Sequence, residues 1–138
     1  MYGTVSFIRS EVFKLKCMKT KRTLVIGASE NPQRYSYLAV QQLLLHEHPV
    51  LAIGKKAGTV NGIKISIEKE MYTDIDTVTL YLNPANQKQY YDYILSLNPK
   101  RIIFNPGTEN RELASLARNN GIEALQACTL VMLSTGQY

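Results

Sequence analysis

Residues 23–36 constrain the fold more than any other stretch, because a short apolar run stops there at a glycine and gives way to a polar loop. Residues 24–26 are apolar at consecutive positions, which is typical of a strand covered on both faces in a parallel sheet. Gly27 allows a sharp turn after that strand. The loop and a helix that opens near Ser36 offer N–H groups to phosphate oxygens, and Arg34 adds a positive charge. The stretch predicts a nucleotide cradle, although it has one glycine where the dinucleotide motif G-x-G-x-x-G has three.

Short apolar runs alternate with helical patterns from residue 23 onward, which indicates repeated strand-helix units and a parallel sheet. Asn83 and Pro84 mark a helix start after the third strand, and Asn120 and Gly121 mark a helix end after the fourth. With right-handed crossovers these units predict an α/β fold, with a three-layer, doubly wound, mostly parallel five-stranded sheet of the Rossmann-like type. The five predicted strands are residues 24–27, 50–53, 78–82, 101–104 and 122–125.

Residues 54–76 lack the pattern of a crossover helix. Asn61-Gly62 is a turn signal, and apolar residues alternate with polar ones over residues 63–67. We therefore expect a short hairpin-like excursion, followed by at most one turn of helix at residues 68–72.

The positive charge of the chain is concentrated at its N-terminal end. Residues 1–22 contain six lysines and arginines and one acid, whereas residues 23–138 contain ten basic and ten acidic residues. The predicted globular part is therefore neutral, which argues against nucleic-acid binding. We expect residues 1–22 to be a basic extension and residues 23–138 to be one domain.

The extension has two interpretations. Val5, Ile8, Val12 and Leu15 recur at helical spacing between basic residues, as in an amphipathic helix that anchors to a surface or a partner. Alternatively, Met18 is a natural start, and the residues before it are an upstream, flexible addition with little role. The second interpretation is favoured.

The two cysteines and the hydropathy pattern indicate a compartment. Cys17 and Cys128 lack the spacing of a metal site or a redox motif, which favours no metal and a reduced, cytoplasmic setting. No apolar run approaches the roughly 18 residues of a membrane span, and the N-terminus lacks the apolar core of a signal peptide. We expect a soluble protein without a membrane partner.

Ligands of open parallel sheets bind beyond the carboxyl ends of the strands, and two of the loops predicted there are informative. An NAD site favours an acid after the second strand, whereas this chain has Gly54-Lys55-Lys56. The lysines suggest an additional phosphate, either the 2′-phosphate of NADP or the 3′-phosphate of coenzyme A; a solvated surface pair is the alternative. The loop of residues 105–110 contains Gly107, which permits close approach of an extended ligand; it also suits helix capping by Thr108 or Asn110.

No catalytic arrangement is visible in the sequence. His46 and His48 fall on the edge opposite the ligand loops, where solvated or helix-terminal positions are expected. Cys128 follows the last strand on the ligand side, so it is either a thiol near a ligand or a small buried side chain. Glu109 and Glu112 form no evident acid/base pair.

Several motifs, in this order and spacing, resemble those of the small stand-alone coenzyme A-binding domain proteins of bacteria and archaea, which are similar to the N-terminal domain of the succinyl-CoA synthetase α subunit. They are residues 25–29, 31–32, 34–36, 60–62, 81–84, 104–108 and 128–130, with the lysines after strand two. The match begins at about Lys19 and runs to the C-terminus. The loop after strand two differs from the Asn-Pro-Lys or Asn-Pro-Arg loop of many members.

The resemblance implies a ligand and a set of contacts. It assigns phosphates to the first loop and its arginine, the ribose phosphate end to the residues after strand two, and adenine and pantetheine to the loops after strands three and four. The residues nominated in this way are Gly27, Ala28, Ser29, Arg34, Lys55, Lys56, Asn83, Pro84 and Gly107. The chain has no counterpart of the ligase domain that bears the phosphorylated histidine of the synthetase, so the enzyme activity is not implied.

The leading hypothesis is non-catalytic binding of coenzyme A or an acyl-CoA, with the pantetheine arm running toward Gly107 and Cys128. One alternative is an NADP-binding oxidoreductase, or a subunit of one, which the same lysines favour and the missing glycines and acid/base residues oppose. Another is an interaction protein with a vestigial nucleotide site, in which the tyrosine-rich residues 90–93 form a surface contact. Whether two copies form a homodimer stays open.

Overall fold

The central element of the fold is β1 (Thr23–Ile26), which lies between β2 and β5 in a sheet of order β3-β4-β2-β1-β5-β6-β7. The computed structural model describes residues 20–138, so the expectations for residues 1–19 lie outside the described residues. The other strands are β2 (Val50–Ile53), β3 (Gly58–Val60), β4 (Ile63–Ser66), β5 (Thr77–Leu80), β6 (Arg101–Phe104) and β7 (Glu123–Gln126). The helices are α2 (Tyr35–Leu45), α3 (Pro84–Gln87), the 3-10 helix η1 (Lys88–Tyr90), α4 (Tyr91–Leu97), α5 (Arg111–Asn119) and α6 (Thr129–Ser134).

The α/β, Rossmann-like architecture is confirmed, but the prediction of five strands is wrong because the sheet has seven. The expected hairpin forms at β3 and β4, and it also joins the main sheet. β4 pairs parallel with β2, and β3 pairs antiparallel with β4 as the sheet edge. The physical reason is burial, since Ile65 and Val60 contribute fully buried side chains to the core under α2.

At most one turn of helix is expected at residues 68–72, and none forms there. The segment crosses to β5 as a loop without regular structure. Two side chains hold the loop against α4 and the core that α4 covers. Tyr93 of α4 donates a hydrogen bond from its hydroxyl to the carbonyl oxygen of Glu70, and Ile75 is buried in the core.

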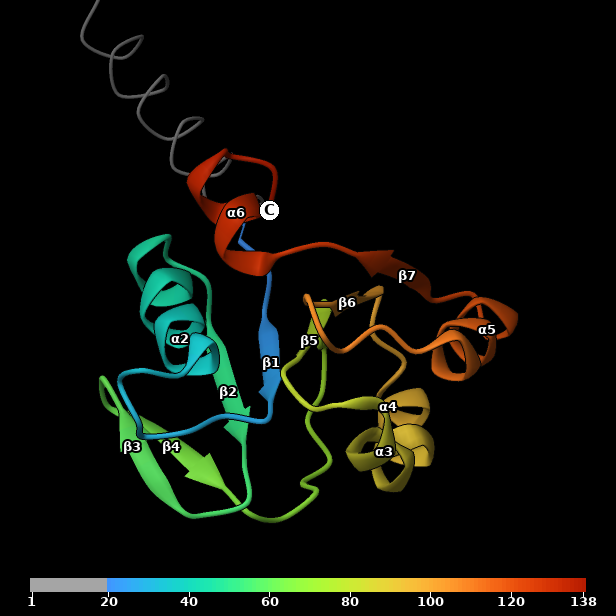
Figure 1. Cartoon of the computed structure of the whole chain (residues 1–138), viewed down its shortest axis with the longest axis horizontal. Helices are drawn as coiled ribbons and strands as arrows, with labels where there is room; N and C mark the ends of the chain where they lie inside the picture. Colours follow the sequence, from blue (N-terminus) through green and yellow to red (C-terminus); the bar gives the residue numbers. More distant parts are fainter. Residues whose placement is uncertain (1–19) are drawn as a thin grey trace, which may run out of the picture.

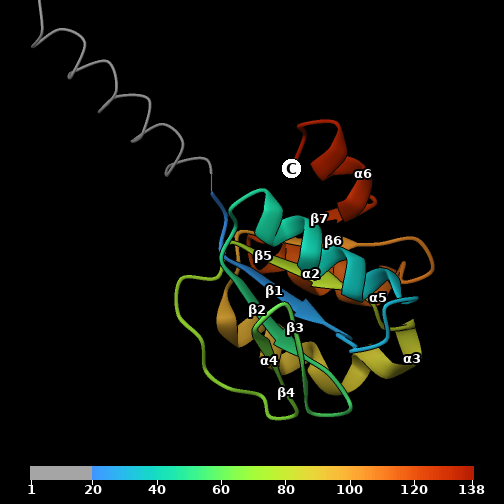
Figure 2. The same ribbon diagram turned by 90° about the vertical axis from the view of Figure 1, so that its left-hand side faces the viewer.

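Helices cover both faces of the sheet. Figure 2 shows α2 on one side of the strands and α3 and α4 on the other. Figure 1 shows α6 beside α2, with α5 next to β6 and β7. Three layers follow from this arrangement, as the doubly wound prediction requires.

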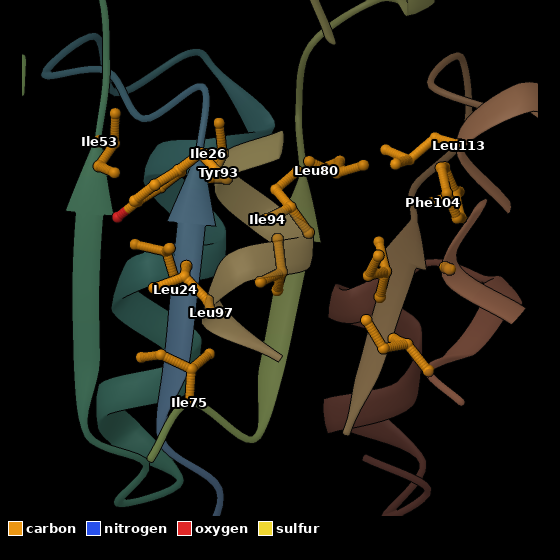
Figure 3. Close-up of a cluster of buried hydrophobic side chains, with 14 residues drawn as sticks. Leu24, Ile26, Ile53, Ile75, Leu80, Tyr93, Ile94, Leu97, Phe104 and Leu113 are labelled. Carbon is orange, nitrogen blue, oxygen red and sulfur yellow. The ribbon is translucent and has the colours of Figure 1, made fainter. Parts of the chain in front are cut away.

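The side chains of β1 alternate between the two halves of the core. Leu24 and Ile26 pack with Ile94 and Leu97 of α4 (Figure 3), whereas Val25 packs under α2. All three β1 side chains are fully buried. This two-sided burial explains why their positions in the sequence are apolar without alternation.

Cap residues set two helix boundaries, the start of α3 and the end of α5. Asn83 accepts the N–H of Asn86 at its Oδ1 (2.9 Å), with Pro84 as the first residue of α3. α5 ends before Asn120 and Gly121, and Gly121 has a φ of 74°. Both boundaries agree with the sequence signals. Among residues 20–138, the structure contains no helix long and apolar enough to cross a bilayer.

Candidate functional site

The carboxyl ends of β1, β2, β5 and β6 meet at one edge of the sheet, where the loops that follow them surround a cleft of about 750 Å³. This volume lies within the range of small-molecule sites. The lining residues are Gly27, Ala28, Ser29, Glu30, Asn31, Arg34, Tyr35 and Ser36 after β1, Lys55, Lys56 and Ala57 after β2, Tyr81, Leu82, Asn83 and Asn86 after β5, and Pro106, Gly107 and Thr108 after β6.

The base of the cleft is the point between β1 and β5 where the strand order reverses. Gly27 turns there with a φ of 98°, and a Cβ atom at this residue would lie 2.8 Å from the carbonyl oxygen of Tyr81. The N–H groups of Gly27 and Ala28 both donate to the carbonyl oxygen of Ile53 at 2.9 Å. The loop therefore leaves β1 tightly against both neighbouring strands, and only glycine fits at its first residue.

The loop from Ala28 to Arg34 is shaped by its own polar side chains. Ser29 accepts the N–H of Asn31 at its Oγ (3.0 Å), and Asn31 accepts the N–H of Gln33 at its Oδ1 (3.0 Å). Arg34 is the N-cap residue of α2, and no side chain caps the helix. The N–H groups of a first helical turn have no acceptor within the helix, and Tyr35 and Ser36 line the cleft. This is the arrangement of an anion site at a helix N-terminus.

Three positive side chains and one carboxylate contribute the charge of the cleft. Arg34, Lys55 and Lys56 are all exposed, and Glu30 is the only acid among the lining residues. No ion pair is found for any of these four residues within the described part of the chain. The cleft thus has a net positive charge that is available to a ligand.

The opposite wall consists of the loops after β5 and β6. Gly107 has a φ of 90°, and a Cβ atom at this position would meet no atom within 4 Å. Its N–H donates to Glu109 Oε1 at 2.8 Å. The wall therefore has open space along Gly107.

A buried polar network holds this wall in place, with Asn105 at its centre. The Asn105 Nδ2 atom donates to Thr79 Oγ1 (2.7 Å) and to the carbonyl oxygen of Leu80 (2.9 Å). Its Oδ1 atom accepts the N–H of Thr129 at 2.9 Å. Asn105 is 2% exposed, so these bonds replace those that water would make.

Gln87 of α3 extends the network toward α5. Its Nε2 atom donates to the carbonyl oxygens of Leu82 and Thr108, both at 2.8 Å. Its Oε1 atom accepts from Asn110 Nδ2 at 2.9 Å, and Asn110 caps α5 through Oδ1, which accepts the N–H of Leu113. Of the two caps suggested by the sequence for this helix, Asn110 is the one observed.

The cleft collects most of the residues nominated from the resemblance. Eight of the nine line it, namely Gly27, Ala28, Ser29, Arg34, Lys55, Lys56, Asn83 and Gly107. Pro84 is not among the lining residues and serves as the first residue of α3. Whether the eight bind a ligand stays a prediction.

Sequence reasoning did not nominate Glu30, Tyr35 or Tyr81, which also line the cleft. Glu30 makes its contact with a strand 29 residues later in the chain, and no local pattern indicates it. Burial raises the pKa of the Tyr81 phenol well above its usual value. The phenol therefore stays neutral at ordinary pH.

The remaining candidates lie away from the cleft. Cys128 is half-buried as the N-cap residue of α6 and does not line the cleft. His46 is exposed, but His48 is buried rather than solvated; its Nδ1 atom accepts the N–H of Lys21 at 2.9 Å. Within residues 20–138, no group of three or more His, Cys, Asp or Glu side chains is placed to hold a metal ion.

The chain matches one known protein family and is similar to several solved structures. Residues 21–134 match the family described as CoA binding domain. A crystal structure of an uncharacterized protein is 51% identical, has a TM-score of 0.85, and covers 86% of this chain and 98% of its own. No curated protein matches the chain at a significant level.

More distant structures show the fold alone. A hypothetical protein from Pyrococcus horikoshii OT3 is 22% identical with a TM-score of 0.78, and the match covers 91% of this chain and 89% of that one. The apo form of a dinucleotide-forming acetyl-coenzyme A synthetase from Ca. Korarchaeum cryptofilum is 17% identical with a TM-score of 0.64. The match covers 80% of this chain but only 27% of that synthetase.

Proposed function

Because the chain belongs to the CoA binding domain family over residues 21–134, we propose that it binds coenzyme A or an acyl-CoA in the cleft and does no chemistry on it. The observation that supports this most directly is the meeting of three cations with an uncapped helix N-terminus. Arg34, Lys55 and Lys56 line the same cleft as the first residues of α2. Coenzyme A has a diphosphate and a 3′-phosphate, so it suits a site with two separate sources of positive potential.

Each part of the ligand has a matching part of the cleft in this proposal. The diphosphate lies against the loop at Ser29 and the start of α2, with Arg34 beside it. The 3′-phosphate lies by Lys55 and Lys56. The pantetheine arm follows the wall at Gly107, where the missing side chain leaves space. The earlier expectation that this arm approaches Cys128 is not retained, because Cys128 does not line the cleft.

Binding without turnover is proposed because the residues around the cleft suggest no acid/base or nucleophilic machinery. Glu30 is the only carboxylate that lines the cleft, and neither the two histidines nor Cys128 lines it. The synthetase neighbour matches this chain over 27% of its own length. Its activity is therefore not carried over to this chain.

Calorimetric titration with coenzyme A, dephospho-coenzyme A, NADP and NAD at one ionic strength tests the proposal. We expect coenzyme A to bind best, and binding to weaken when the 3′-phosphate is removed. Preference for NADP would support an oxidoreductase instead. Absence of binding by all four ligands would favour a vestigial site and an interaction role.

A further inference from the structure

Glu30 makes a contact that the proposed ligand contacts do not explain. It lies in the loop after β1, and its Oε2 atom accepts the N–H of Thr59 in β3 at 3.0 Å. β3 is the edge strand of the sheet (Figure 1), so the N–H of Thr59 has no neighbouring strand to bond with on that side. The Glu30 carboxylate therefore takes the place of a strand partner at this edge.

Two glycines allow the chain after β2 to lie close to the loop after β1, and they flank the two lysines of the cleft. A Cβ atom at Gly58 would lie 2.2 Å from the Glu30 Cδ atom. A Cβ atom at Gly54 would lie 2.4 Å from the carbonyl oxygen of Ala28. The segment of residues 55–57 is thus held at both ends against the loop after β1, by approaches that a side chain would prevent.

We propose that Glu30 is a positioning residue that holds Lys55 and Lys56 against the phosphate-binding loop, and thereby strengthens the binding of a ligand with the same sign of charge as its own carboxylate. This inference rests on the proposed coenzyme A function. It assigns to Glu30 no contact with the ligand. The contact acts through the main chain of β3, which fixes where the lysine segment ends.

Electrostatics alone predicts the opposite effect of Glu30 on binding. The proposal can therefore be tested by whether coenzyme A affinity rises or falls when Glu30 is replaced. Removing a carboxylate from a cleft that binds phosphates should raise affinity if charge alone matters. Removing the contact with Thr59 should lower affinity if positioning matters. Glu30→Ala removes both the charge and the acceptor, whereas Glu30→Gln removes the charge and keeps an acceptor oxygen.

The experiment compares the wild type with Glu30→Ala, Glu30→Gln and Gly58→Ala, and uses Glu123→Ala as the matched loss of one acid outside the cleft. Amide exchange of Thr59 is followed by NMR in the ligand-free protein, and coenzyme A and dephospho-coenzyme A are titrated by calorimetry. In Glu30→Ala and Gly58→Ala we expect Thr59 to exchange about tenfold faster and coenzyme A affinity to fall about tenfold. Dephospho-coenzyme A should change by less than about twofold, since it lacks the phosphate that the lysines meet.

The conservative variant and the double variant complete the test. Glu30→Gln should bind coenzyme A at least as tightly as the wild type. The double variant Glu30→Ala with Gly58→Ala should bind no more weakly than either single variant, because both remove the same contact. Glu123→Ala should match the wild type in Thr59 exchange.

The possible failures are distinguishable. Equal or tighter coenzyme A binding by Glu30→Ala, or unchanged Thr59 exchange in that variant, would overturn the positioning role while leaving the proposed function intact. Equal losses for coenzyme A and dephospho-coenzyme A would also overturn it, because they would indicate general damage to the cleft. If the wild type does not bind coenzyme A, the proposed function fails and the positioning role fails with it.

Discussion

At the scale of single residues, the cleft combines side chains that are free with main-chain positions that are fixed. Arg34, Lys55 and Lys56 are exposed and form no ion pair with another described residue. The main chain of the loops that carry these residues is nevertheless positioned by close contacts at Gly27 and Gly54. A ligand phosphate would therefore meet charges that need not first give up an internal partner.

Replacing the basic side chains should weaken binding without loss of fold. We expect Arg34→Ala, and Lys55→Ala combined with Lys56→Ala, each to reduce the free energy of coenzyme A binding by about 1–3 kcal/mol, the size of charge-assisted hydrogen bonds. Calorimetry measures the effect. Lys64→Ala is the control, because Lys64 is exposed on β4 and does not line the cleft. Unchanged affinity in the first two variants would refute the phosphate assignment.

Gly27 is required by the fold itself, and not only by a ligand. Its φ of 98° is costly for a residue with a side chain, and a Cβ atom there would lie 2.8 Å from the carbonyl oxygen of Tyr81. We expect Gly27→Ala to lower the free energy of unfolding by more than about 1 kcal/mol, since a left-handed conformation alone costs that much. Urea unfolding measures it. Gly62→Ala is a useful comparison, because its φ is also positive but no atom lies within 4 Å of the added carbon; equal losses in the two variants would show that the contact with Tyr81 has no effect.

At the scale of elements, the wall at Gly107 is held by hydrogen bonds that link three segments distant in sequence. Asn105 joins the end of β5 to the first residue of α6, and Gln87 joins α3 to the loop after β6. Both side chains are almost completely buried. Loops with this support keep their geometry without a ligand, which lowers the ordering cost of binding.

The replacement Asn105→Ala should destabilise the protein strongly. It leaves the carbonyl oxygen of Leu80 and the N–H of Thr129 with one partner fewer in a buried place. Each buried group that loses its partner costs about 1–3 kcal/mol, and we expect a loss of this size or more in the free energy of unfolding. Urea unfolding is the measurement, with Asn119→Ala on the exposed surface of α5 as the control. A loss no larger than that of the control would mean that water replaces these bonds.

The elements that the sequence predicted well are those with local signals. Consecutive apolar residues indicated β1, and Asn83 with Pro84 indicated the start of α3. β3 was recognised only as part of a hairpin, because its three residues have one buried apolar side chain and its place depends on pairing with β4. Glu30 could not be predicted from a local pattern, since its contact joins the loop after β1 to strand β3, 29 residues later, and requires Gly58.

At the scale of the whole molecule, residues far apart in the sequence contact one another at the amino ends of the strands, on the side of the sheet opposite the cleft. The main-chain oxygen of Tyr138 accepts a hydrogen bond from Arg101 at 2.9 Å, and the guanidinium lies 4.4 Å from the centre of the Tyr138 ring. The Tyr138 hydroxyl is 2.6 Å from Thr23 Oγ1 in β1. None of these contacts has a sequence signature, so they could not be predicted. The fold class and the edge that carries the ligand loops could be predicted, because their signals are local.

His48, which contacts Tyr138 and Lys21 in the same region, makes the free energy of unfolding of the protein dependent on pH. Burial lowers the pKa of His48 below its usual value near 6.5, and the positive charges of His46, Lys21 and Arg101 act in the same direction against a smaller opposing effect of Asp76. The folded state therefore favours the neutral ring, whose Nδ1 atom accepts the N–H of Lys21. Above pH 6.5 the ring is neutral in both states and its full contribution is present. As the pH falls below that value, the unfolded chain binds the proton more readily, and the free energy of unfolding decreases until the folded protein is protonated as well.

Urea unfolding at about pH 7.5 and about pH 5.5 tests this dependence. We expect the wild type to lose stability between the two values, and His48→Gln to lose less over the same interval because it has no group that titrates there. His46→Gln should lose less than the wild type but more than His48→Gln, because it removes only one of the positive charges that lower the pKa of His48. His48→Gln should also start from a lower stability at the higher pH, because the packing of the His48 ring against Tyr138, at 4.8 Å between ring centres, is lost. Equal losses in the wild type and His48→Gln would mean that the ring titrates alike in both states, and the pH dependence would then belong to the carboxylates.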